Sequence, residues 1–253
     1  MRVGVHMDTR DLKCEPSSAL SEREMRRWAY QRCIKDYLRV VASIDDNVGR
    51  LLDYLHEEGL AYDTLVVYTS DRGFFLGDHG WYDKRFMYEE SLRMPLILRY
   101  PGEVEPTGVN DDLVLNVDFA PLFLDLAGIP IPASMQGRSF RSLLHGHTFP
   151  DWRQSLYYRY WMHKAHHNVY AHYGIRTRRY KLIHYYADAV AQPGAIDEPH
   201  EPEWELFDLE RDPNELHNVY DDPLYIEVVV RLKDDLHHLQ ARLGDQRYVK
   251  DTD

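Results

Sequence analysis

Three ionisable side chains, Asp71, His79 and Lys84, follow one apolar segment of the chain at short range and are accompanied by glycines. The segment 64–69 is short, rich in β-branched residues and nearly free of polar side chains, which is typical of a strand buried on both faces in a parallel sheet. Ligands of open α/β sheets bind outside the carboxyl ends of the strands, so Asp71 followed by Gly73 favours a metal or anion site. An Asx turn, in which the Asp71 side chain only caps the loop, explains the same pattern equally well.

The motif that contains these residues is long and specific. From Ser70 it reads Ser-Asp-x-Gly-Phe-Phe-Leu-Gly-Asp-His-Gly-x-x-Asp-Lys-Arg-Phe-Met-Tyr-Glu-Glu-Ser-Leu-Arg-x-Pro-Leu-Ile, and it closely resembles the sulfatases of the alkaline phosphatase superfamily. The resemblance continues in the segments 26–32, 37–52, 125–130, 137–140, 173–177, 180–183 and 205–215. It therefore covers nearly the whole chain.

The resemblance implies hydrolysis of a sulfate ester by a formylglycine nucleophile, which is made from the Cys of a Cys-x-Pro-Ser-Arg motif and lies beside a calcium ion. It makes Asp71 a calcium ligand and Lys84 a contact of the sulfate. Both residue types suit these roles, because a hard cation prefers carboxylate oxygens and a flexible ammonium suits a tetrahedral oxyanion. His79 lies in the same loop, where we expect it to contact the substrate or to hold the loop by a hydrogen bond.

Position 72 departs from the family pattern, which commonly has Asn, Gln or His there as another metal ligand. Arg72 has five N–H donors, no acceptor and a permanent positive charge, so it cannot ligate calcium and repels it at short range. Either the metal site is lost, or the Arg72 side chain points away from it. A third alternative is that the guanidinium replaces the metal as the positive charge beside an anion.

The nucleophile motif has no clear counterpart. In the family it lies far upstream, after a strand that carries a pair of metal-binding Asp residues, whereas most of the 70 residues before Asp71 fit a single helix. We therefore expect this N-terminal half to be missing. The segment 14–18 matches four positions of Cys-x-Pro-Ser-Arg, but it ends in Ser18, and we interpret it as a loop. Cys14 is thus not assigned as the nucleophile, and Asp8 and Asp11 follow no apolar strand that would make them metal ligands.

Composition limits the partners and the compartment. The 253 residues are 44% hydrophobic, which is enough for a buried core, and the net charge of −12 argues against nucleic acid and anionic membranes as partners. In so acidic a chain the positive charges of Lys84, Arg85 and Arg93 are more informative. Two cysteines, Cys14 and Cys33, do not predict a disulfide framework, and no signal peptide or transmembrane run is evident, so the location stays open.

The expected fold is α/β: a partial alkaline-phosphatase-like mixed or parallel sheet with covering helices, followed by a small antiparallel α+β C-terminal subdomain. Ser21 and Glu24 form a capping box for a helix over 22–57 that ends before Gly59 and covers the sheet with its apolar stripe. A further strand over 95–100 and a helix capped by Asp118 complete a βαβ-like unit. After a boundary near residue 150 we expect strands over 156–160, 173–176, 180–186 and 203–209 and a closing helix over 223–243. Residues 1–150 then form the catalytic part and residues 151–253 the C-terminal subdomain.

The histidine-rich segment 163–172 has three interpretations. His166 and His172 are candidates for a shared metal ion, but no Cys or carboxylate accompanies them at a ligand spacing, which favours a surface loop. The resemblance adds a third interpretation, because this segment aligns with a part of the sulfatase subdomain that borders the substrate cleft. His166 is then a substrate-binding residue.

Three functions remain open for the whole chain. The first is sulfuric ester hydrolysis on a sulfated small molecule or glycan, complete only when the missing N-terminal half is supplied. The second is a non-catalytic remnant that binds an anionic glycan, which Arg72 and the lack of a nucleophile favour. The third is hydrolysis of phosphomonoesters or phosphonate esters on the same superfamily scaffold.

Overall fold

The computed structural model describes residues 20–106 and 108–245, and these divide into two compact units. The first consists of the described residues up to Lys84 together with Glu90–Glu105. The second consists of Arg85–Glu89 and the described residues from Pro106 onward. The boundary predicted near residue 150 separates two domains of the sulfatase family. The two compact units divide the chain elsewhere and do not test this boundary, so it stays a prediction.

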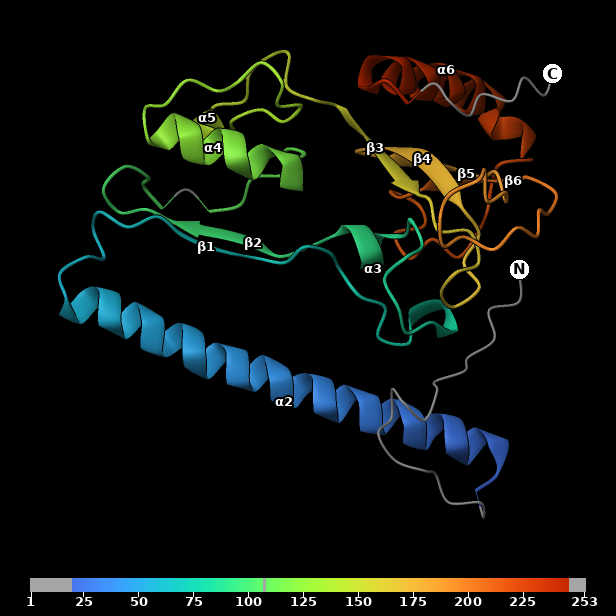
Figure 1. Cartoon of the computed structure of the whole chain (residues 1–253), viewed down its shortest axis with the longest axis horizontal. Coiled ribbons are helices and arrows are strands. Elements are labelled where there is room, and N and C mark those ends of the chain that lie inside the picture. Colours follow the sequence, from blue (N-terminus) through green and yellow to red (C-terminus); the bar gives the residue numbers. More distant parts are fainter. Residues whose placement is uncertain (1–19, 107, 246–253) are drawn as a thin grey trace. The chain divides into compact units, whose positions relative to one another are not determined.

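The first unit begins with the long helix α2 (Glu22–Glu57; Figure 1). The Ser21 hydroxyl accepts from the amide of Glu24, whose carboxylate in turn accepts from Ser21, so the predicted capping box is confirmed. The helix ends before Gly59, whose φ of 70° suits a glycine. The predicted apolar stripe is not covered, because no α2 side chain is buried within the described residues.

The loop that contains the candidate residues connects the two strands of a small sheet. Strand β1 (Val66–Thr69) pairs with β2 (Leu96–Arg99), with Thr69 opposite Leu96 (Figure 1). The pairing is antiparallel, so the expectation of a parallel βαβ-like arrangement is wrong for this pair. The strands are also half-exposed rather than buried on both faces, with Ile97 63% exposed. Between them lie the short helices η1 (Asp78–Gly80) and α3 (Glu89–Leu92).

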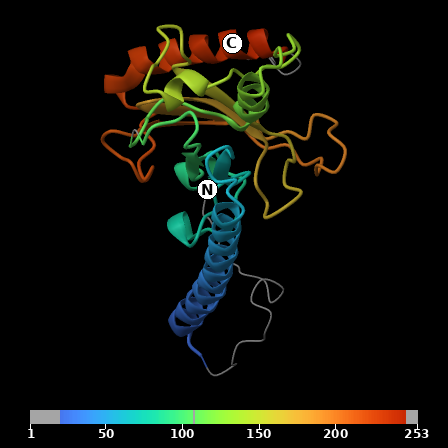
Figure 2. The same ribbon diagram turned by 90° about the vertical axis from the view of Figure 1, so that its left-hand side faces the viewer.

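The second unit contains a four-stranded antiparallel sheet in sequence order, as predicted. Its strands are β3 (Ser155–Tyr160), β4 (His172–Thr177), β5 (Tyr180–Tyr185) and β6 (Glu203–Asp208). After the turn η3 (Pro223–Tyr225), the closing helix α6 (Ile226–Leu243) lies along one face of this sheet (Figure 2).

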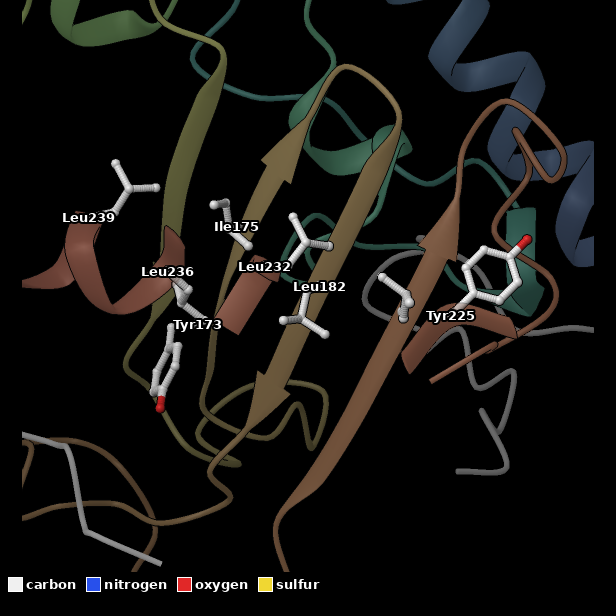
Figure 3. Close-up of a cluster of buried hydrophobic side chains, with 8 residues drawn as sticks. Tyr173, Ile175, Leu182, Tyr225, Leu232, Leu236 and Leu239 are labelled. Atoms are coloured by element: carbon white, nitrogen blue, oxygen red, sulfur yellow. The ribbon is translucent and has the colours of Figure 1, made fainter. Parts of the chain in front are cut away.

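The core of the second unit lies between α6 and the sheet. Leu232, Leu236 and Leu239 of α6 face Ile175 and Leu182 of the central strands (Figure 3). All five are at most 7% exposed. Because burying each such side chain contributes about 1.5–3 kcal/mol, this interface holds the helix on the sheet.

Three short helices precede the sheet: η2 (Asn116–Asp118), α4 (Phe119–Leu126) and α5 (Arg141–Leu144). Asp118 lies at the start of α4 as predicted, but its carboxylate makes no capping bond to that helix. It is fully buried and accepts instead from the guanidinium of Arg153 and from the Arg138 amide at 2.8 Å. The Asp118 carboxylate pairs with Arg153 rather than with the amides at the start of α4, because a buried carboxylate needs a neutralising charge.

Among the described residues, no helix has both the length and the apolarity needed to span a lipid bilayer. Cys33 lies half-buried in α2. Cys14, Asp8 and Asp11 lie outside the described residues.

Candidate functional site

The loop after β1 is shaped by backbone and hydroxyl contacts. The Ser70 hydroxyl donates to the carbonyl of Arg72 at 2.9 Å, which closes a tight turn around Asp71. Both Asp71 and Arg72 are exposed at this turn. The turn therefore presents one carboxylate and one guanidinium next to each other at the carboxyl end of β1.

Gly73 fixes this turn against α3. Its amide donates to the carbonyl of Ser91 at 2.8 Å. A Cβ atom at this position would lie 2.1 Å from the carbonyl oxygen of Glu90, a distance that no side chain tolerates. Only glycine fits here, because the backbone of α3 occupies the space of a side chain.

The main chain of Lys84 is held by Ser91, the residue whose carbonyl accepts from Gly73. The Ser91 hydroxyl donates to the Lys84 carbonyl at 2.6 Å, and Ser91 is only 3% exposed. Ser91 thus joins Lys84 on one side to Gly73 on the other. Within the described part of the chain, the Lys84 ammonium has no hydrogen bond or ion pair, so its charge is available to an anion.

His79 lies in the loop between Gly73 and Lys84 with its backbone in the left-handed region, at φ 54°. Its ring contacts the buried Phe75 edge-on, with 5.9 Å between the ring centroids. Its Nε2 lies 3.6 Å from Oε1 of Glu90, the residue before Ser91. His79 thus has two neighbours in its own unit, and both expected roles, contact with a substrate and a hydrogen bond that holds the loop, stay predictions.

The two candidate histidines of the second unit lie in different environments. His166 is exposed in the turn between β3 and β4. His172 is fully buried in β4, where its ring stacks on Tyr160 at 5.5 Å and its Nδ1 donates to the Tyr170 carbonyl at 2.7 Å. Burial lowers the pKa of His172 to about 4, so the ring is neutral. The shared metal site considered for this pair has no support in this geometry.

Residues near Lys84 fit a calcium ion only in part. Calcium takes about 6–8 oxygen ligands. Within the ranges 20–106 and 108–245, no three His, Cys, Asp or Glu side chains form a group that could hold a metal. Asp71 supplies one carboxylate and Arg72 supplies none, so these residues do not make a calcium site by themselves.

The segment that follows Lys84 is packed into the second unit. Phe86 and Met87 are at most 5% exposed, and the Tyr158 hydroxyl donates to the Arg85 carbonyl at 3.1 Å. Tyr88 donates to the carboxylate of Glu205 at 2.9 Å. Burial raises the pKa of Glu205, although the hydrogen bonds that its carboxylate accepts from Tyr88 and Tyr185 act to lower it.

Glu90 and Ser91 had no predicted role, although both stand in the motif, and Gly73 was expected only to let the backbone approach a ligand closely. Their function is main-chain contact, which residue type does not reveal. The only signal was the position of a glycine and a small hydroxyl residue within a run of charged side chains.

Comparison with known protein families agrees with this arrangement. The family model "N-sulphoglucosamine sulphohydrolase, C-terminal" matches residues 77–242, and the model "Sulfatase" matches residues 7–129. An N-acetylglucosamine-6-O-sulfatase of Bacteroides thetaiotaomicron is 44% identical over 228 residues, which are 89% of this chain and 39% of that protein. Arylsulfatase K of Rattus norvegicus is 32% identical over 186 residues, covering 72% of this chain and 31% of that protein.

Solved structures give the same result. A protein in complex with its substrate D-glucosamine-2-N,6-O-disulfate superposes with a TM-score of 0.82 at 43% identity, covering 90% of this chain and 44% of that one. A phosphonate monoester hydrolase from Silicibacter pomeroyi has a TM-score of 0.71 at 27% identity, covering 85% and 42%. The chain thus spans less than half the length of these relatives. It belongs to the sulfatases of the alkaline phosphatase superfamily and corresponds to a C-terminal portion of them.

Proposed function

We propose that this chain forms the sulfate-binding part of a sulfuric ester hydrolase that acts on a sulfated amino sugar. The observation that carries the proposal is the motif around Lys84, whose backbone is held by Ser91 and whose ammonium is not engaged within the described residues. The relatives of highest identity among those named above act on or bind 6-O-sulfated glucosamine compounds, which supports this substrate class.

Lys84 would bind the sulfate by charge. An ammonium on a flexible stem donates to several oxygens of a tetrahedral anion and neutralises part of its charge. His79 would stand beside it as a second donor from the same loop, and His166 would contact the sugar from the subdomain. These three roles are part of the proposal.

The nucleophile would come from a polypeptide segment other than the described residues. Cys33 cannot supply it, because it lies within α2 and is followed by Ile34 rather than by the motif that formylglycine formation needs. Sulfatases are generally metal-dependent, and we propose calcium as the ion, with Asp71 as one ligand and the remaining oxygens from that same segment. The chain on its own would then bind substrate without turning it over.

Binding of D-glucosamine 6-sulfate to the chain, measured by isothermal titration calorimetry, tests the proposal. Lys84→Ala should weaken the affinity about tenfold or more, because a hydrogen bond to a charged group contributes about 1.5–3 kcal/mol. Lys35→Ala removes an equal charge from the exposed face of α2 and should leave the affinity unchanged. Equal affinity for unsulfated D-glucosamine, or no effect of Lys84→Ala, would defeat the proposal.

Hydrolysis of a phosphonate monoester is the second candidate, favoured by the likeness to the phosphonate monoester hydrolase at 27% identity. It predicts that a phenyl phosphonate monoester competes with the sulfated sugar for the Lys84 site. If the phosphonate binds more tightly than the sulfated sugar, this candidate replaces the first.

A further inference from the structure

A cluster of four charged side chains lies inside the second unit. Lys181 of β5 is 0% exposed, and its Nζ lies 2.9 Å from Oε1 of Glu89 and 2.6 Å from Oε1 of Glu215. Arg176 of β4 donates to Glu89 through Nε at 3.2 Å and Nη2 at 3.0 Å. Two cations thus face two carboxylates, and the four residues come from four separate segments of the chain.

Stability alone does not account for such a cluster. Taking charges out of water costs several kcal/mol for each ion, and apolar residues of similar volume often serve a core equally well or better. Lysine is among the residues that are almost never fully buried unless paired. A buried ion cluster does, however, fix the geometry of its members, because each carboxylate tolerates only a narrow range of positions beside its cations.

The cluster fixes the position of the first residue of α3. Glu89 is the first residue of α3, and its side chain is held by Arg176 and Lys181. Its backbone amide donates to Oε2 of Glu215 at 2.7 Å, so the main chain is held as well. Burial opposes ionisation of Glu89, but the charge of Lys181 and the hydrogen bonds from Arg176 outweigh it and lower its pKa to about 2.

The same short helix holds the backbone of the candidate site. Ser91 stands two residues after Glu89 and makes the hydrogen bonds to the Lys84 carbonyl and the Gly73 amide described above. A helix of four residues is too short to keep its own conformation in water. The position of Ser91 therefore depends on what anchors Glu89.

We propose that Lys181, Glu215, Arg176 and Glu89 are positioning residues: they hold the first residue of α3, the helix whose Ser91 bonds the main chain of Lys84 and of Gly73. This proposal rests on the proposed function for the role of Lys84, whereas the geometric part concerns only α3 and its contacts. The residues of the cluster do not touch the sulfate themselves.

Hydrogen exchange of the Gly73 amide, followed by NMR on the whole chain, tests the geometric part without any ligand. Lys181→Met leaves Glu89 and Glu215 without their shared cation, so the Gly73 amide should exchange about tenfold faster or more. Lys181→Arg keeps the charge and should restore most of the protection. Arg153→Met is the matched control, because it removes the cation beside the buried Asp118 in the same unit without touching α3.

The control should lower the melting temperature of the protein while Gly73 exchange stays as in the wild type. If Lys181→Met does not fold, Glu215→Gln takes its place, since it keeps the size of the side chain and removes its charge. Gly73 exchange that stays at the wild-type rate in the folded variant overturns the proposal. Acceleration that is equal in Arg153→Met also overturns it, because the effect would then be general loosening.

Affinity for D-glucosamine 6-sulfate, measured on the same variants, separates this proposal from the proposed function. Lys181→Met should weaken sulfate binding about tenfold, and Arg153→Met should not change it. If the wild-type chain binds no sulfated sugar, the proposed function fails, and the exchange rates still decide whether the cluster positions the Lys84 backbone.

Discussion

Gly73 is the residue at which the candidate site tolerates the least change. A methyl group there would overlap the Glu90 carbonyl, and because the clashing atoms belong to the backbone, no side-chain rotation can relieve the overlap. Gly73→Ala should therefore cost about 2 kcal/mol or more of unfolding free energy and abolish binding of the sulfated sugar. Urea unfolding and calorimetric titration measure the two effects. Gly128→Ala, where no heavy atom lies within 4 Å of the added Cβ, should keep sulfate binding.

His172 predicts how stability depends on pH. Burial lowers the pKa of His172 to about 4, and burial together with the charge of Lys233 lowers that of His184 to about 4. An unfolded histidine titrates at about 6.5, so the unfolded chain binds protons first as the pH falls. The stability contributed by each neutral ring is fully present above about pH 6.5 and is lost toward pH 4, on the order of 3 kcal/mol per histidine.

His172→Phe checks this assignment. Phenylalanine keeps the stacking on Tyr160 and removes the titrating group, so between pH 4 and 7 the variant should lose less stability than the wild type in urea unfolding, by on the order of 3 kcal/mol. An unchanged pH dependence in this variant would show that burial does not lower the pKa of His172 as described.

At this scale, the sequence predicted the residue types of the candidate site but not the partners that hold them. Asp71, His79 and Lys84 could be singled out because they stand within one motif. Glu89 and Glu215 are 126 residues apart, and no local pattern relates them. Contacts made by the main chain, such as Gly73 with Ser91, leave no trace in side-chain chemistry.

Helix α2 is the element whose bounds were predicted best, because its start and end have local causes. The capping box at Ser21 and the glycine at position 59 act within a few residues of the chain. The antiparallel pairing of β1 with β2 could not be predicted in the same way, since the sequence of a strand does not determine the direction of its neighbour. Asp118 shows the same limit, because its distant partner Arg153 took the carboxylate that local pattern assigned to a cap.

Gly49 within α2 and Gly59 just after its end give a matched test of this local reasoning. Gly49 lies within the helix with no heavy atom near the position of a Cβ, so Gly49→Ala should stabilise the protein by about 0.5–1 kcal/mol. Gly59 has a φ of 70°, which strains any L residue, so Gly59→Ala should destabilise it by about 1 kcal/mol. Urea unfolding of both variants measures the difference, and a shift of the same sign in both would contradict the helix end as described.

On the scale of the whole molecule, α2 exposes several large apolar side chains. Its exposed large side chains include Leu38 and Leu51, each 56% exposed, and Val40 at 58%. The isolated two-stranded sheet adds the exposed Ile97, and such small sheets are only marginally stable in water.

We therefore expect the chain to self-associate when it is studied alone, because exposed large apolar side chains favour association. Static light scattering should give a mass above that of one 30.0 kDa chain. Leu38→Gln with Leu51→Gln should reduce the association, and Ala42→Gln with Ser43→Gln, which removes no large apolar side chain, should not. A monomer at all concentrations would contradict the expectation.

The second unit is discontinuous in sequence, and this has a consequence for how it can be made. It includes Arg85–Glu89, of which Phe86 and Met87 are buried, while Glu90–Glu105, which separate this stretch from Pro106, belong to the other unit. Residues 85–89 are synthesised before β3 to β6 and α6. The unit is therefore complete only when this earlier stretch packs against the later elements. A recombinant fragment that starts at Pro106 would leave Lys181 with Arg176 and Glu215 alone in the interior. Any attempt to produce the second unit separately therefore has to begin at or before Arg85.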